Sequence, residues 1–156
     1  MRIELPVDAH LPHDYISSQR LRLEMYQRLA EVRSDDDVME VLAELLDRYG
    51  EPPRPVTTLL QVARLRAHAR RAGLTELTAQ GNYIRFAPVE LPDSGQLRLE
   101  RLHPKSVVKF GAKTILVPRP RTAPVGGQPL QDEELLGWCR GVIDGVLRPA
   151  PVASTA

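Results

Sequence analysis

The sequence predicts an α+β fold in which helices come first, a small antiparallel sheet follows and one helix closes the chain. Two changes of pattern carry this prediction. Residues 18–72 place apolar side chains at helical spacing, whereas residues 77–117 contain short apolar runs separated by glycine turns. Residues 131–147 then return to helical spacing. No internal repeat is present.

The chain is expected to begin with an extended segment. Over residues 3–16 two prolines interrupt any helix, and the first apolar side chains alternate with polar ones as they do in strands. A first helix is then expected over residues 18–33, because apolar residues recur at helical spacing there. Ser17 or Ser18 is placed to cap its first turn.

Two further helices are expected in the first half of the chain. The second runs over residues 35–49, with Ser34 as its N-cap and three aspartates at the positive end of the helix dipole. Gly50 ends it, and two prolines prevent its continuation. The third runs over residues 55–72 and stops before Gly73.

The second half of the chain reads as two hairpins with a short helix between them. The first hairpin occupies residues 77–86 and turns at its Gly-Asn pair. A helix is expected over residues 94–103, and the second hairpin turns around Gly111. Residues 118–129 are rich in Pro, Arg and Gly and are expected to form a mobile loop.

The last helix is expected over residues 131–147 and carries three glycines spaced four apart. Each such glycine costs about 1 kcal/mol relative to alanine, so we expect another backbone to approach closely along Gly137, Gly141 and Gly145. Residues 1–148 are expected to form a single domain, followed by a disordered tail at 149–156.

Composition excludes several classes of function. The net charge of +1 gives no overall attraction to nucleic acid or to an anionic membrane. One cysteine excludes an internal disulfide and a cysteine-based zinc site. No run approaches 18 apolar residues, and the first residues do not resemble a signal peptide. The protein is therefore expected in the cytoplasm, without contact to a membrane.

No motif for catalysis, cofactor binding or metal binding is recognised. The stretch Gly111-Ala112-Lys113-Thr114 lacks the glycines of a phosphate-binding loop, and no Gly-x-Ser-x-Gly elbow is present. His10 and His13 lie in an extended stretch bracketed by prolines, without a nearby cysteine or carboxylate cluster typical of a metal site. We expect no catalytic residue, cofactor or metal, although residues distant in sequence can still converge on a site in the fold.

A basic stretch in the third helix is the first of two candidate sites. Arg64, His68, Arg70 and Arg71 lie on one side or near one end of that helix. They make a nucleic-acid-binding module the alternative function. The same residues fit a solvated helix end, where arginines favour the negative dipole, and no aromatic residue for base stacking lies nearby.

The second candidate is the polar side of the second helix. At 100° per residue, one stripe is apolar and faces the core; it comprises Val38, Val41, Leu42, Leu45 and Tyr49. Charged residues gather on the other side, namely Glu40, Glu44, Asp47 and Arg48. Spacing alone fits an ordinary solvated face as well as a binding patch.

Four segments share their order and spacing with one known family. They read LPVDAHLP with DYI after it, RLEMYQRLA, ELLDRYG followed by two spaced prolines, and LL with VARLR after it. Together they resemble the start of the C-terminal domain of bacterial transcription-repair coupling factor (Mfd) over residues 3–73. From Leu74 onward only the order of elements is similar, and the proline-rich loop departs from the family.

The resemblance implies a role in transcription-coupled excision repair. Proteins of this family are ATP-driven DNA translocases that displace stalled RNA polymerase and recruit UvrA. Their motor domains are absent from this chain, so contact with DNA is expected only through those domains.

In the family, the C-terminal domain is regulatory and non-catalytic. It packs on the UvrB-like module of the same protein and masks the surface that UvrA binds. The Glu-x-x-Asp-Arg contact motif corresponds to Glu44, Asp47 and Arg48, and Glu40 extends the same face. Carboxylates and a guanidinium at this spacing suit polar pairs that set specificity more than affinity.

Overall fold

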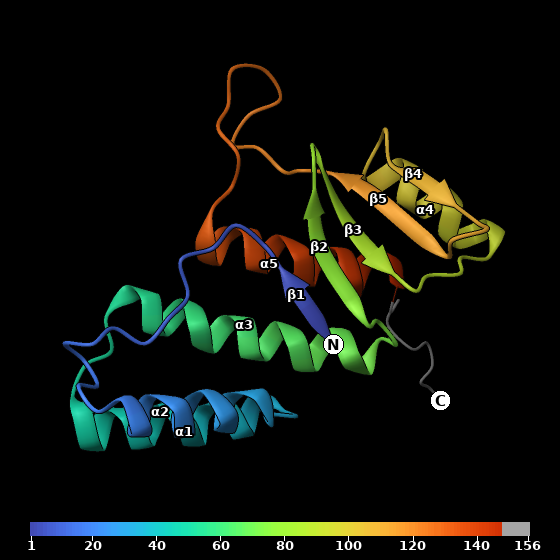
Figure 1. Ribbon diagram of the computed structural model, residues 1–156. Coiled ribbons are helices and arrows are strands. Elements are labelled where there is room, and N and C mark those ends of the chain that lie inside the picture. Colours follow the sequence, from blue (N-terminus) through green and yellow to red (C-terminus); the bar gives the residue numbers. More distant parts are fainter. Residues whose placement is uncertain (148–156) are drawn as a thin grey trace. The chain divides into compact units, whose positions relative to one another are not determined.

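The computed structural model describes residues 1–147, and these form two compact units (Figure 1). The helical unit comprises residues 7–68. The sheet unit comprises residues 1–6 together with the described chain from residue 69 onward. The predicted tail at 149–156 lies outside the described residues. No described helix is long and apolar enough to cross a membrane.

The helical unit contains the three predicted helices. They are α1 (Gln19–Ala30), α2 (Asp35–Tyr49) and most of α3 (Arg54–Arg71). The side chains of Ser18 and Ser34 each accept a hydrogen bond from an amide of the turn that follows, at 3.2 and 3.1 Å. These caps satisfy amides that have no partner inside the helix, which explains where α1 and α2 begin.

One apolar core holds the helical unit together. The predicted stripe of α2 faces this core, since Val38, Val41 and Leu45 are buried and Leu42 and Tyr49 are partly buried. The other buried members come from the N-terminal segment, α1, the connection between α1 and α2, and α3: Leu11, Ile16, Met25, Leu29, Val32, Val56, Leu60, Ala63 and Ala67. The polar side of α2 therefore faces away from the core.

The sheet unit is built on a five-stranded mixed sheet in the order β1-β2-β3-β5-β4. Both predicted hairpins form, and β3 pairs with β5 to join them in one sheet. The pairing of β1 with β2 is parallel and was not expected from the sequence. The strands are β1 (Arg2–Glu4), β2 (Glu76–Gln80), β3 (Tyr83–Ala87), β4 (Val107–Lys109) and β5 (Thr114–Pro118).

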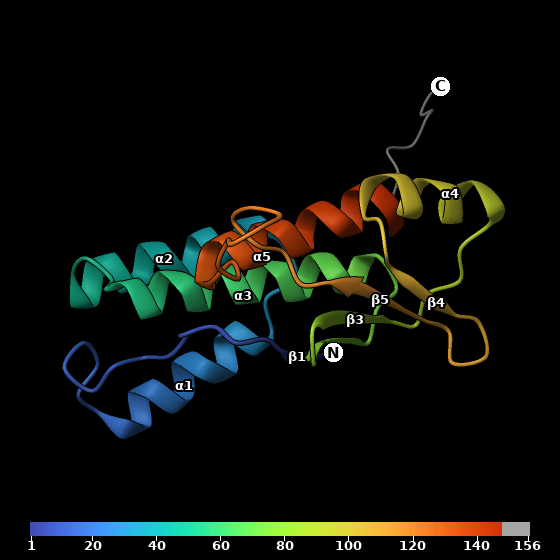
Figure 2. The same ribbon diagram turned by 90° about the horizontal axis from the view of Figure 1, so that it is seen from above.

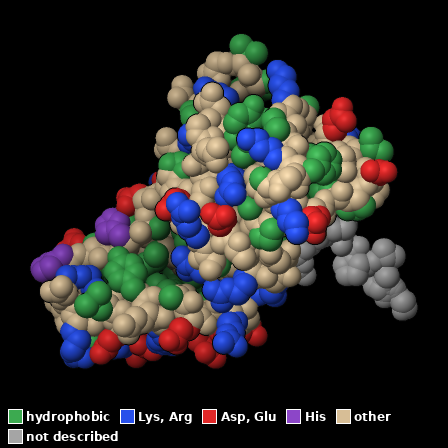
Figure 3. Space-filling view, turned by 45° about the vertical axis from the view of Figure 1, so that its right-hand side comes forward, with side chains coloured by type: hydrophobic (Ala, Val, Ile, Leu, Met, Phe, Trp, Pro, Cys, Tyr) green, Lys and Arg blue, Asp and Glu red, His purple; other side chains and the backbone are tan. Residues whose placement is uncertain are grey.

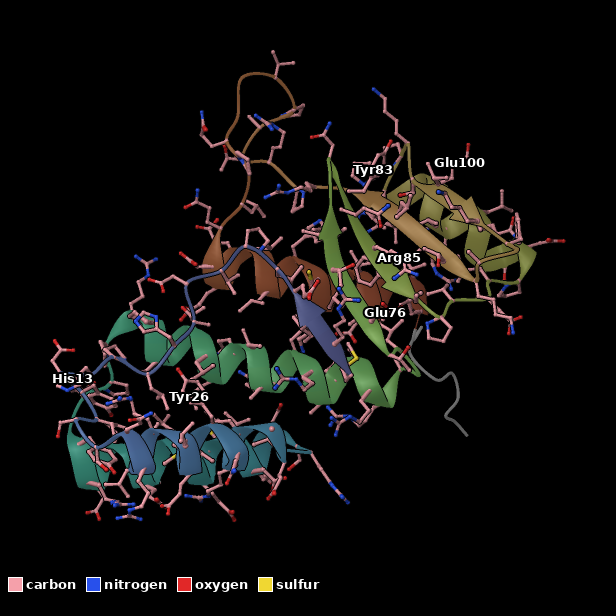
Figure 4. The ribbon with its side chains drawn as sticks, in the orientation of Figure 1. His13, Tyr26, Glu76, Tyr83, Arg85 and Glu100 are labelled. Atoms are coloured by element: carbon pink, nitrogen blue, oxygen red, sulfur yellow. The ribbon has the colours of Figure 1, made fainter. Side chains whose placement is uncertain are left out.

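Charged side chains link the first three strands. Glu76 on β2 contacts Arg2 on β1 at 3.4 Å and Arg85 on β3 at 3.1 Å. Figure 4 shows Glu76 and Arg85 next to each other on neighbouring strands. Cross-strand pairs of opposite charge favour one register over its neighbours, so this cluster helps fix the short parallel strand.

Helices cover one face of the sheet. Within the sheet unit, α4 (Asp93–Leu102) and α5 (Asp132–Val142) lie on the same side of the strands (Figure 2). The ring of Phe86 on β3 meets that of Trp138 on α5, with centroids 6.4 Å apart. This contact lies within the buried layer between the sheet and α5, where Phe86 is fully buried.

The last predicted helix differs from expectation in two ways. Its final turn is π-helical, η1 (Ile143–Leu147), rather than a continuation of α5. The expected close approach of another backbone along the glycines is wrong for the described chain. A Cβ at Gly137 or Gly141 would meet open space, and at Gly145 it would meet only the Leu102 side chain, at 3.5 Å. These glycines lie away from the buried stripe of α5, and nothing in the structure requires them.

The proline-rich segment 118–129 forms an organised loop with a short bridge between Arg121 and Pro129. The Thr122 amide donates to the carbonyl of Gln128 at 2.8 Å. Gly127 packs so closely on the Ala123 backbone that a Cβ has no room. The loop therefore has a defined path even though it contains little regular structure.

Candidate docking site on helix α2

The predicted polar residues of α2 lie together on its outer side. Glu40, Asp47 and Arg48 are exposed, and Glu44 lies among them with its side chain 33% exposed. We call these four residues the α2 patch. In Figure 3, acidic and basic side chains lie intermixed along the lower left edge of the view. The positions i, i+4, i+7 and i+8 bring the four side chains onto one side of the helix.

Glu44 is the organising residue of the α2 patch. One of its carboxylate oxygens forms an ion pair with Arg28 of α1, and the other contacts Arg48 at 3.1 Å. Both oxygens are thus engaged within the helical unit. The sequence did not reveal the role of Arg28, because it lies 16 residues away on another helix.

The charge of Glu44 is stabilised by these neighbours. Partial burial acts to raise the pKa of the carboxyl, but hydrogen bonds from Arg28 and Arg48, together with their positive charges, outweigh it and lower the pKa. Glu44 therefore remains ionised at neutral pH. It holds Arg48 in place rather than serving as a vacant acceptor for a partner.

This lowered pKa predicts a pH-dependent contribution to stability. A carboxyl with a lower pKa in the folded state stabilises the fold above its unfolded pKa of about 4.3, and this contribution is lost as the pH falls through the folded value. The stability advantage of the native protein over Glu44→Gln should therefore shrink as the pH is lowered from 7 past about 4. Urea unfolding of both proteins at several pH values measures this difference in stability.

An Arg28→Gln/Arg48→Gln background provides the control for this prediction. Without the two guanidinium groups, the effect of Glu44→Gln should vary much less with pH over the same range. An equal pH dependence in both backgrounds would assign the effect to some other carboxyl.

Arg48 is held on two sides. Besides the carboxylate of Glu44, its guanidinium carbon lies 5.1 Å from the centroid of the Tyr49 ring, within cation–π distance. The Tyr49 ring in turn packs against Tyr15, with centroids 5.7 Å apart. Within residues 1–147, Asp47 and Glu40 form no ion pair. The α2 patch thus presents two available carboxylates beside a positioned guanidinium.

The basic residues of α3, which are the alternative site, are only partly accessible to a partner. Arg64 binds both carboxylate oxygens of Asp35, at 3.2 and 3.3 Å, and His68 is buried. Arg70 and Arg71 are exposed. Arg64 is therefore already paired and His68 is buried, so these two residues contribute little to a surface for phosphates. The burial of His68 was not evident from sequence, because a histidine fits either side of an amphipathic helix.

The described residues offer little for metal or redox chemistry. Within residues 1–147 no three His, Cys, Asp or Glu side chains are grouped so as to hold a metal ion. His10 lies 2.8 Å from Asp8 and is exposed. Cys139 is buried in α5, and burial raises the pKa of its thiol to about 12, so the sulfur remains protonated at neutral pH.

Comparison with known proteins identifies the family. The TRCF domain family matches residues 5–96. The transcription-repair-coupling factors of Mycobacterium tuberculosis and Mycobacterium bovis are each 48% identical over 162 residues, covering 97% of this chain. That of Escherichia coli is 38% identical over 87 residues, covering 54% of this chain. The chain spans about 13% of the mycobacterial proteins and 8% of the Escherichia coli protein.

A solved structure shares the fold. The crystal structure of the C-terminal domain of transcription-repair coupling factor matches 88% of this chain and 86% of its own, with a TM-score of 0.68 and 20% sequence identity. The family match covers more than half of the chain, and the four segments that suggested the resemblance lie within it. The chain belongs to the TRCF domain family, the C-terminal domain of transcription-repair coupling factor.

Proposed function

We propose that this chain is a non-catalytic regulatory domain that docks on the UvrB-like module of a transcription-repair coupling factor and masks the surface that UvrA binds. The observation that carries the proposal is the arrangement of the α2 patch. Asp47 and Glu40 are available carboxylates, and Arg48 is an exposed guanidinium held by Glu44 and Tyr49. Such a surface fits a partner with complementary charges.

The four residues of the α2 patch have different roles in this proposal. Asp47 and Glu40 accept hydrogen bonds from basic groups of the partner, and Arg48 donates to a carboxylate of the partner. Glu44 is a positioning residue, because Arg28 and Arg48 already occupy both of its oxygens. Fixing Arg48 before docking reduces the side-chain entropy that is lost when the interface forms.

The proposed contact suits a clamp that must open. An exposed ion pair contributes about 0–1 kcal/mol, so a few of them hold two modules together only weakly in free solution. Within one polypeptide the effective concentration of the two modules is high, and a weak contact then suffices. A competing partner can displace a contact of this strength.

The proposal extends to the complete protein. In the complete protein the motor domains contact DNA and perform ATP hydrolysis, while this domain has no catalytic role. Engagement of RNA polymerase is coupled to release of the clamp and gives UvrA access. The protein acts in the bacterial cytoplasm.

A charge swap tests the docking role. In a full-length transcription-repair coupling factor that carries this domain, Asp47→Arg combined with Arg48→Asp places like charges at both contacts while net charge is unchanged. We expect UvrA binding to strengthen by about tenfold, which corresponds to the loss of about 1.4 kcal/mol of masking. A pull-down or titration with UvrA measures the change.

A matched swap on α1 provides the control. Arg20 and Glu24 form an exposed pair at i, i+4, and Arg20→Glu with Glu24→Arg reverses it without touching the α2 patch. This variant should bind UvrA as the native protein does. If the α2 swap leaves UvrA binding unchanged in a folded protein, the docking assignment is wrong, and DNA binding by the isolated domain becomes the next hypothesis to test.

A further inference from the structure

The sheet unit contains an open pocket of about 530 Å³ that the docking role does not use. Its walls come from the end of α4, the end of β5, the loop 118–129 and α5. Leu102 and Leu130 line it together with several prolines, and the indole of Trp138 contributes an aromatic surface. The pocket is thus mainly apolar, with its one large aromatic group inside.

Trp138 is held firmly in this pocket. Its ring lies nearly perpendicular to that of His103, with centroids 5.7 Å apart, and it also contacts Phe86 of the sheet core. These two contacts fix the indole and leave only part of it accessible. An aromatic side chain fixed before binding loses little entropy when a partner packs on it.

The loop that forms the rim is also tied to the scaffold. The amide of Arg119 donates to the carbonyl of Asn82 in the β2–β3 turn at 2.9 Å. The amide of Leu130 donates to the carbonyl of Pro120 at 3.0 Å, which closes the base of the loop. The rim is therefore pre-formed, as is usual for small-ligand and peptide pockets.

The charges at the rim have one sign. Among the described residues that line the pocket, Arg119 and Arg121 are the only Arg, Lys, Asp or Glu side chains. Neither forms an ion pair within residues 1–147, although Arg121 donates to the carbonyl of Gly127. Burial lowers the pKa of His103, which favours its neutral form. The carboxylates that begin α5 lie outside the lining.

We propose that this pocket binds a short acidic and apolar segment of a partner protein. An apolar side chain of the segment enters between Leu102, Leu130 and Trp138, and a flanking carboxylate pairs with Arg119 or Arg121. A guanidinium binds a carboxylate through two parallel hydrogen bonds, which gives the contact direction as well as strength. The site lies apart from the α2 patch in sequence and does not depend on the docking role.

The observations favour a peptide over a single-stranded nucleic acid. Base stacking needs an open aromatic face, whereas Trp138 is only partly exposed and its ring contacts both Phe86 and His103. A nucleic-acid chain also needs a groove of positive charge along several phosphates, and this rim offers two arginines. Proline and leucine walls match an aliphatic or aromatic side chain of a peptide instead.

The pocket lies beyond the part of the chain that the family model matches. All of its lining comes from residues after 101, whereas the family match ends at residue 96. The mycobacterial relatives align over 97% of the chain, and the Escherichia coli relative aligns over 54%.

Trp138 allows a direct test, because it is the only tryptophan of the chain. The probe is the capped heptapeptide Asp-Glu-Leu-Phe-Asp-Glu-Leu, titrated into the protein while Trp138 fluorescence is followed. We expect a saturable change in emission. Arg119→Glu with Arg121→Glu should weaken the binding at least about tenfold, and a peptide with serine in place of its Leu and Phe residues should not bind.

A second double variant distinguishes the loss of the two rim arginines from a general change in net charge. Arg20→Glu with Arg54→Glu removes the same charge from exposed positions of the helical unit, and binding should stay within about twofold of native. Circular dichroism and the urea midpoint establish that each variant is folded. Absence of saturable binding by the native protein, or equal loss in both double variants, overturns the proposal. So does binding of oligothymidylate at the rim in place of the peptide.

Discussion

Replacing Phe86 by alanine is expected to lower the free energy of unfolding by about 3–5 kcal/mol, the usual cost of deleting a large ring from a packed interior. Phe86 is completely buried on β3 and contacts Trp138 of α5. The substitution removes the apolar contact between the sheet and its covering helix and leaves a cavity there. Urea unfolding followed by circular dichroism measures the loss.

Phe110 offers the matched control for this prediction. It is the only other phenylalanine of the chain, and it lies 66% exposed in the turn after β4. Phe110→Ala should change the stability by no more than about 0.5 kcal/mol. Similar losses for the two variants would show that Phe86 is not the core residue of the sheet unit.

The second large effect is expected in the helical unit. Leu45 is completely buried on the apolar stripe of α2, so Leu45→Ala should cost about 2–5 kcal/mol. Its neighbour Leu46 on the same helix is 42% exposed, and Leu46→Ala should cost much less. Helix propensity changes equally in the two variants, so the difference between them isolates the burial of Leu45.

The Leu45→Ala variant also tests whether residues 1–148 unfold as the single domain predicted from the sequence. Trp138 belongs to the sheet unit, whereas Leu45 belongs to the helical unit. In a single cooperative domain, the transitions seen by Trp138 fluorescence and by circular dichroism shift together. A fluorescence transition that stays in place while part of the helical signal is lost earlier would contradict a single domain.

Local signals in the sequence predicted most of the individual elements. The serine caps, the glycine that ends α2 and the Gly-Asn turn of the first hairpin act within a few residues, so their effects can be read without the tertiary structure. Gly50 and Gly81 adopt positive φ angles of 83° and 60°, as these positions require. The apolar stripe of α2 was predicted correctly for the same reason.

Features that depend on distant residues were missed. The pairing of β1 with β2 joins residues more than 70 positions apart. A strand of three residues has too short a pattern of apolar and polar side chains to predict which strand it pairs with. For the α2 patch, the spacing of the residues predicted correctly which side of the helix they share. It did not predict the ion pair from Arg28, which makes Glu44 a positioning residue instead of an exposed acceptor.

The parallel pairing of β1 has a consequence for the order in which the chain folds during synthesis. Residues 7–68 are contiguous and emerge from the ribosome before residue 76, so the helices can associate while β1 still has no partner. The edge of the sheet is completed only after β2 has been translated. Because non-local pairing is slow relative to local helix formation, we expect the N-terminal strand to become protected later than the helices that follow it in the sequence.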